Sequence, residues 1–172
     1  WSGGNSKRYL IIHHTASSPN TTFANIVAFF KRKDEISIHY VVGRQGEIVQ
    51  LADENDRCFH AGRSEWQGQT NLNNHSIGIE VLSDGSNFNE IQIEATIWLI
   101  KDIMARNAIP YDKVLRHAQV ALPTGRKSDI GPNFYKNWGT WEIFQRSLRG
   151  ATPETLRRIK EAADRKKLRL KK

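Results

Sequence analysis

An imidazole, an ammonium and a carboxylate lie close together in residues 116–132, a stretch punctuated by prolines and glycines. His117 and Asp129 are of residue types that ligate metal ions, and Lys127, two residues before Asp129, could hold an oxyanion nearby. A loop restricted by proline and glycine can direct such side chains toward one point. Because two ligands do not make a zinc site, a third ligand and a base must come from elsewhere in the chain.

Two candidates for these roles stand near the ends of predicted strands. The apolar run 9–12 ends in His13, and the alternating segment 76–82 carries Glu80 on its small-residue face. Strand ends are the usual place for site residues in α/β sheets. Taken singly, each residue has an ordinary interpretation: a hydrogen-bonded core histidine, a solvated glutamate, or loop charges in ion pairs. Together they form a complete set.

That set predicts hydrolysis of an amide bond. A catalytic zinc takes three protein ligands and keeps one open position, and His13, His117 and Asp129 supply the three. Two neutral imidazoles and one carboxylate leave the ion positively charged, which lowers the pKa of bound water. Glu80 would take the proton of the attacking water and pass it to the leaving amine. Lys127 would stabilise the tetrahedral oxyanion.

We expect these residues to be positioned by one α/β domain with a central sheet. Hydrophobic periodicity predicts strands over 9–12, 36–42, 47–51, 76–82 and 114–115, and helices over 23–33, 89–107 and 141–148. Gly43 to Gly46 predicts a hairpin turn between the second and third strands. Residues 53–74 are polar and long for a compact domain, which favours a binding loop.

The charge of the chain is concentrated at its C-terminal end. The 172 residues carry a formal net charge of +8, and nine basic and two acidic residues from Arg157 onward account for +7 of it. We therefore divide the chain into a catalytic domain, 1–150, and a basic helical tail, 151–172, whose helix Thr152-Pro153-Glu154 would open. The tail is either a solvated helix or a contact to anionic cell-wall polymers or a membrane surface. Nucleic-acid binding is not expected, because the tail has no aromatic residues on which bases could stack.

No segment approaches the length of a membrane-spanning apolar helix, which takes about 20 residues. The first residues, Trp1-Ser2-Gly3-Gly4, lack the charged and apolar regions of a signal peptide. Cys58 is the single cysteine, so no internal disulfide can form, and it is expected to be a bystander.

Five motifs in order resemble one known family, the type-2 N-acetylmuramoyl-L-alanine amidases, which are zinc peptidoglycan amidases related to peptidoglycan recognition proteins. The resemblance covers roughly residues 8 to 140. The motifs are Ile11-Ile12-His13-His14-Thr15-Ala16, Ile38-His39-Tyr40-Val41-Val42 with Gly46, Phe59-His60-Ala61-Gly62, Ser76-Ile77-Gly78-Ile79-Glu80, and His117 followed by Arg126-Lys127-Ser128-Asp129-Ile130-Gly131-Pro132.

The resemblance implies a mixed sheet flanked by helices, with Zn²⁺ at the bottom of a peptidoglycan groove. It implies cleavage between the lactyl group of N-acetylmuramic acid and L-alanine of the stem peptide. Position by position, it assigns the metal to His13, His117 and Asp129, and catalysis to Glu80 and Lys127. It also assigns substrate contacts to His60, Ala61 and Arg126.

The same resemblance sets the expected context. The substrate would be peptidoglycan or a muropeptide, and the chain would act on the cell wall, as a secreted, periplasmic or phage-delivered protein. A monomer is expected. Ile38 stands where some relatives have a catalytic tyrosine together with a cysteine ligand, so the chain resembles the glutamate-and-aspartate branch. The stretch from His117 to Asp129 is longer than the family pattern, so the placement of Lys127 depends on how that stretch folds.

Two other functions fit some of these residues. A non-catalytic peptidoglycan receptor on the same fold would usually lack a zinc ligand. An iron oxygenase with two histidines and one carboxylate would leave Glu80 and Lys127 without a role. Of the remaining histidines, His14 should point away from the metal, whereas His39 could pack in the core or support a ligand.

Overall fold

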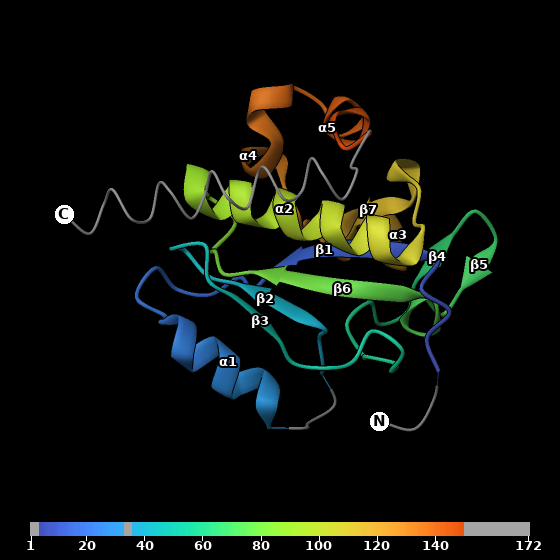
Figure 1. Ribbon diagram of the computed structural model, residues 1–172, viewed down its shortest axis with the longest axis horizontal. Helices are drawn as coiled ribbons and strands as arrows, with labels where there is room; N and C mark the ends of the chain where they lie inside the picture. The colour runs from blue at the N-terminus through green and yellow to red at the C-terminus, as the bar shows by residue number, and fades with distance from the viewer. Residues whose placement is uncertain (1–3, 33–35, 150–172) are drawn as a thin grey trace.

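A five-stranded mixed sheet forms the centre of the protein in the computed structural model, which describes residues 4–32 and 36–149 (Figure 1). Its strand order is β3-β2-β6-β1-β7. β1 is parallel to both β6 and β7, β2 is parallel to β6, and β3 is antiparallel to β2. The predicted α/β class and mixed sheet are confirmed. The strands are β1 (Tyr9–His14), β2 (Tyr40–Val42), β3 (Ile48–Gln50), β6 (Ser76–Val81) and β7 (Val114–Arg116).

Helices cover both faces of the sheet. The long helix α2 (Glu90–Asn107) runs along one face, and α1 (Phe23–Lys31) lies on the other (Figure 1). Asn89 caps α2 by accepting a hydrogen bond from the backbone N–H of Gln92. The helix ends at Ala108, which adopts a left-handed conformation with φ of 53° and donates its N–H to the Met104 carbonyl. This cap ends the helix before Ile109 and Pro110, where the sequence predicted its end.

The alternation of side chains along the strands puts the main hydrophobic core on one face of the sheet and the candidate site residues on the other. In β6, Ile77, Ile79 and Val81 pack against α2, together with Leu10 and Ile12 of β1. Successive strand residues point to opposite faces, so His13 and Glu80 lie on the face turned away from α2. His14 lies on the α2 face, beside Phe88, as expected.

Two predicted segments differ from the structure. The second strand was expected over 36–42 but pairs only at Tyr40–Val42, because Ser37 instead hydrogen-bonds the backbone of Phe59 with both its N–H and its hydroxyl. The polar stretch 53–74 contains elements that the sequence did not predict. They are a small hairpin of β4 (Glu65–Trp66) and β5 (Gln69–Thr70), followed by a 3-10 turn, η1 (Leu72–Asn74).

The stretch 116–132 was predicted as a loop, but it begins with a short helix, α3 (His117–Val120). The Gln119 side chain accepts a hydrogen bond from the Arg116 backbone N–H and so starts this turn. Farther on, an aromatic cluster of Phe134, Trp141 and Phe144 packs short helices onto the α2 layer. These remaining elements are η2 (Tyr111–Lys113), α4 (Pro132–Tyr135), η3 (Lys136–Trp138) and α5 (Trp141–Ser147).

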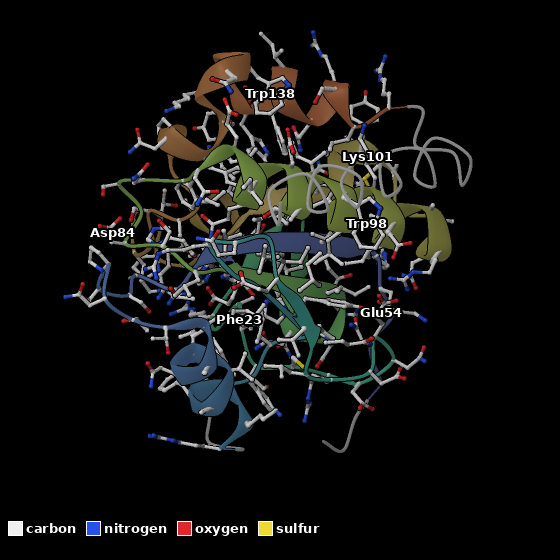
Figure 2. The ribbon with its side chains drawn as sticks, turned by 60° about the vertical axis from the view of Figure 1, so that its left-hand side comes forward. Phe23, Glu54, Asp84, Trp98, Lys101 and Trp138 are labelled. Carbon is white, nitrogen blue, oxygen red and sulfur yellow. The ribbon has the colours of Figure 1, made fainter. Side chains whose placement is uncertain are left out.

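Labelled side chains mark the two outer layers. Phe23 on α1 and Trp138 of η3 lie on opposite sides of the sheet (Figure 2). Within residues 4–32 and 36–149, no helix combines the length and hydrophobicity that crossing a membrane requires. The boundary predicted at 150 and the basic helix predicted over 151–172 fall outside the described residues.

Candidate metal centre

Three side chains from separate elements converge at one edge of the sheet. His13 lies near the end of β1, His117 follows directly on the neighbouring β7, and Asp129 ends the loop after α3. The two Nδ1 atoms are 2.9 Å apart, and Asp129 Oδ2 lies 3.3 Å from His13 Nδ1 and 3.1 Å from His117 Nδ1. All three residues are buried. This cluster, which the sequence predicted, could hold one metal ion.

A backbone contact brings the last of these residues into place. The Ala118 N–H donates to the Asp129 carbonyl over 2.6 Å, next to His117 in the chain. Residues 121–128 therefore form an excursion, which leaves the end of α3 and returns beside its first turn. The excursion carries Arg126 and Lys127 and lies outside the cluster itself.

The charges at the cluster favour a cation. Burial and the neighbouring His117 lower the pKa of His13 to about 4, although Asp129 acts in the opposite direction. Burial opposes ionisation of Asp129, but hydrogen bonds from His117 and His13 outweigh it and lower its pKa. His13 is thus held neutral and Asp129 anionic, which suits the binding of a cation at this point.

Glu80 stands directly beside this cluster. It is the register partner of His13 in the adjacent strand, and both residues lie on the same face. Its Oε2 atom is buried and has no hydrogen-bond partner among the described residues. Burial and the Asp129 carboxylate raise the pKa of Glu80 well above its usual value, and Lys127 acts in the opposite direction. A buried carboxyl group without a partner is a candidate for proton transfer.

Lys127 and Arg126 lie together on the exposed part of the excursion. The positive charge of Lys127 lowers the pKa of both Glu80 and His13, so its ammonium group is within electrostatic range of both. Arg126 donates hydrogen bonds to the backbone carbonyls of Leu122, Arg63 and Ala61, at 2.7, 3.1 and 3.3 Å. Arg126 thus ties the excursion to residues 61–63.

His60 and Ala61, which the resemblance assigns to substrate contact, are 8% and 0% exposed. His60 Nδ1 lies 3.0 Å from His13 Nε2, and the Ala61 carbonyl lies 3.2 Å from His117 Nε2. The structure therefore places this pair next to the cluster, in contact with the Nε2 atoms of the two histidines, whose Nδ1 atoms face Asp129. His39, whose role the sequence left open, accepts from the Gly78 N–H at 3.0 Å and packs its ring edge against His60.

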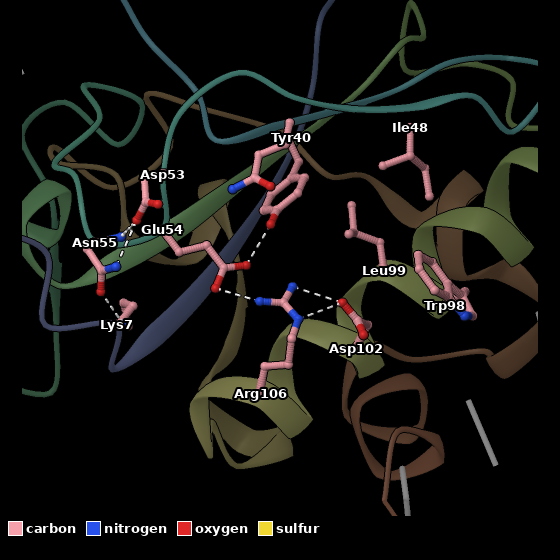
Figure 3. A pocket seen from close by; sticks show the side chains of 11 residues that line it. Lys7, Tyr40, Ile48, Asp53, Glu54, Asn55, Trp98, Leu99, Asp102 and Arg106 are labelled. Carbon is pink, nitrogen blue, oxygen red and sulfur yellow. Dashed lines mark hydrogen bonds and ion pairs between the residues drawn. The ribbon is translucent and has the colours of Figure 1, made fainter. Parts of the chain in front are cut away.

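A separate hollow of about 610 Å³ lies on the α2 face and contains none of these residues (Figure 3). Glu54, one of its lining residues, accepts hydrogen bonds from Tyr40, Arg106 and Asn107 at 2.7, 2.8 and 2.7 Å. Arg106 also pairs with Asp102. This network joins α2 to the segment after β3. Sequence reasoning missed it, because a single glutamate in a polar stretch carries no periodic signal.

The fold agrees with comparisons to known proteins. The family model described as N-acetylmuramoyl-L-alanine amidase matches residues 3–132. The chain belongs to this family.

Two relatives illustrate the extent of the similarity. The N-acetylmuramoyl-L-alanine amidase AmiD of Escherichia coli (strain K12) is 34% identical over 167 residues, which cover 87% of this chain and 56% of AmiD. The 1,6-anhydro-N-acetylmuramyl-L-alanine amidase AmpD of Salmonella typhimurium (strain SL1344) is 33% identical over 100 residues, 58% of this chain and 52% of AmpD. The chain thus spans little more than half the length of either relative.

Solved structures share the architecture. A complex of AmiD from E. coli with the substrate anhydro-N-acetylmuramic acid-L-Ala-D-gamma-Glu-L-Lys has a TM-score of 0.69 at 32% identity, covering 85% of this chain and 59% of that one. A mutant endolysin from Bacillus subtilis has a TM-score of 0.63 at 26% identity, covering 84% of this chain and 87% of that one.

Proposed function

We propose that this chain is a zinc-dependent amidase that cleaves the amide bond between the lactyl group of N-acetylmuramic acid and L-alanine in peptidoglycan. The observation that carries this proposal is the convergence of His13, His117 and Asp129 beside the buried carboxyl group of Glu80. Family membership supplies the reaction type.

The donor set fits zinc. Two imidazole nitrogens and one carboxylate oxygen are the ligands of many catalytic zinc sites, which leave a further position open. The same three atoms lie within hydrogen-bond distance of one another, and a cation bound there would replace the shared protons as their common partner. A zinc ion held by these residues would supply Lewis acidity for polarising the scissile carbonyl and for lowering the pKa of water.

The chain's own residues then carry out the proton transfers. Glu80 accepts a proton from the attacking water as the new C–O bond forms, and its raised pKa makes it a stronger base than a solvated glutamate. The same proton passes to the nitrogen of L-alanine as the C–N bond breaks. The ammonium group of Lys127 stabilises the negative charge on the former carbonyl oxygen.

The substrate is peptidoglycan or a muropeptide derived from it, in keeping with the muropeptide bound in the AmiD complex. The place of action is the cell wall, reached by secretion, in the periplasm or by delivery as a phage endolysin. The basic residues from Arg157 onward would add attraction to anionic wall polymers or a membrane surface. We propose a monomer and no nucleic-acid partner.

Product analysis tests this function. Zinc-loaded protein incubated with purified sacculi should release stem peptides and expose free L-alanine amines, and both a chelator and Glu80→Gln should suppress the release. New reducing sugar ends without free amines would refute amidase activity. Binding to sacculi without turnover in zinc-containing buffer would instead identify a receptor.

A further inference from the structure

We infer that the dipeptide His60–Ala61 is a positioning element, which orients both histidines of the metal cluster and selects the ring nitrogen that each turns toward the metal. The inference rests on the proposed metal site and adds a role for residues behind it. The His60 ring and the Ala61 carbonyl each contact the outer nitrogen of one histidine, at 3.0 and 3.2 Å. One short segment thus contacts both ligands.

Only one position of the ring proton of His117 is compatible with its contact to Ala61. A carbonyl oxygen accepts hydrogen bonds and cannot donate them, so His117 must carry its proton on Nε2 to bond Ala61. The lone pair of His117 Nδ1 is then free to face the metal. The Ala61 carbonyl also accepts from Arg126, which holds it from the solvent side.

The contact to His13 is settled by a chain of three hydrogen bonds. The Ser76 hydroxyl donates to the Leu72 carbonyl over 2.6 Å, so its oxygen is left to accept from His60 Nε2 at 3.3 Å. A neutral His60 with its proton on Nε2 has an acceptor at Nδ1. His13 must therefore donate from Nε2, which leaves its Nδ1 to the metal. The backbone carbonyl of Leu72 in this way determines the tautomer of His13 through a chain of three hydrogen bonds.

The dipeptide is itself held firmly. The Asn73 side-chain oxygen accepts from the backbone N–H groups of both His60 and Ala61, at 3.1 and 2.8 Å. Gly78 makes room for the His60 ring, because a Cβ at that position would lie 2.7 Å from His60 Nδ1. Partners of this kind orient metal-ligating histidines, and their loss commonly weakens metal binding by about 10- to 100-fold.

Zinc affinity, measured by competition with a chromophoric chelator on the full chain, tests the inference. His60→Ala should weaken zinc binding by about 10- to 100-fold. His60→Asn, which keeps an acceptor atom near the position of Nδ1, should recover most of that loss. His75→Ala is the matched control, since His75 is a histidine that bonds Ser6 away from the cluster, and it should bind zinc as the unchanged protein does.

A second readout needs no metal. Two-bond ¹H–¹⁵N spectra of the metal-free chain should show His13 and His117 protonated on Nε2. In His60→Ala, His13 should become a mixture of tautomers while His117 stays unchanged; Ser76→Ala provides the same test if His60→Ala does not fold. Unaltered zinc affinity in His60→Ala, or equal losses in His60→Ala and His60→Asn, would overturn the inference. Failure of the unchanged protein to bind zinc would overturn the proposed metal site alone, because the tautomers still report on the dipeptide.

Discussion

Glu80 and His13 are register partners in adjacent parallel strands, and their side chains share the face of the sheet opposite α2. The strand pairing thus places the proposed general base beside a proposed metal ligand without any contribution from loops. Because both residues sit on interior strands of the sheet, their separation is set by regular backbone geometry. This rigidity suits groups that must act on one water molecule.

Replacing Glu80 with glutamine should reduce the rate of amide cleavage by about 10²- to 10⁴-fold, because an amide cannot accept the proton of the attacking water. Zinc binding should be retained, since Glu80 is outside the cluster of ligands. Release of L-alanine amines from a defined muropeptide measures the rate. Glu142→Gln, on the exposed surface of α5, is the control. Full activity in Glu80→Gln would remove Glu80 from the mechanism.

Lys127→Met should lower kcat by about 10²- to 10³-fold through loss of oxyanion stabilisation. It should also move the acid limb of the pH–rate profile to higher pH. The reason is that the Lys127 charge lowers the pKa of Glu80, so that its removal raises this pKa, and Glu80 must be deprotonated to act. Lys127→Arg keeps the charge and should keep the acid limb in place. Profiles that coincide for all three proteins would contradict this coupling.

Removal of the metal should lower thermal stability. Zinc at one hundred times its dissociation constant would stabilise the folded chain by about 2.7 kcal/mol, which corresponds to several degrees in Tm. Asp129→Asn should abolish most of the response to zinc and to chelator, whereas Asp112→Asn, at an exposed position, should respond like the unchanged chain. Differential scanning calorimetry with and without chelator measures the effect. A zinc response of unchanged size in Asp129→Asn would argue against Asp129 as a ligand.

The Glu54 network should contribute to stability in a pH-dependent manner. Burial raises the pKa of Glu54, but hydrogen bonds from Tyr40, Asn107 and Arg106 outweigh it, so the pKa lies below the ordinary 4.5. The folded state therefore gains stability from this carboxylate above pH 4.5, and the gain is lost as the pH falls through the lower folded-state value. Glu54→Gln should lower the free energy of unfolding by about 1–2 kcal/mol at pH 7. Urea unfolding should show this difference shrinking toward pH 3, and a constant difference would contradict the assignment.

The basic tail gives a prediction from sequence alone. Deleting the residues after Gly150 should leave cleavage of a soluble muropeptide nearly unchanged and weaken binding to whole sacculi at low salt, because the deletion removes the concentrated positive charge. Pull-down of the two forms over a salt series measures the effect. Equal sacculus binding at low salt would exclude an electrostatic role for the tail.

The elements with strong periodicity could be predicted from the sequence. The alternation in 76–82 placed Glu80 on the correct face, and the apolar stripe of 89–107 predicted α2 from its Asn89 cap to its last residue. His13 and Glu80 were both expected near strand ends, and the parallel pairing of β1 and β6 makes them register partners. Such periodic patterns depend only on residues that are close in the sequence, so they can be recognised before the fold is known.

The parts that escaped prediction depend on contacts between distant residues. The hydroxyl of Ser37 bonds the backbone at Phe59 and so shortens β2, and no pattern near Ser37 reports this. The contact of His60 with His13 was not predicted, because the two residues lie 47 positions apart in the chain. Such pairings appear only when the chain is folded.

The hydrogen bond from the Ala118 N–H to the Asp129 carbonyl closes a loop whose two ends carry His117 and Asp129. The separation of these two residues is therefore fixed where the ends meet and does not depend on the length of chain between them. A change of length would be accommodated at the exposed tip, Pro123 to Gly125, because Arg126 bonds the backbone of residues 61–63 and the Lys127 charge acts on Glu80.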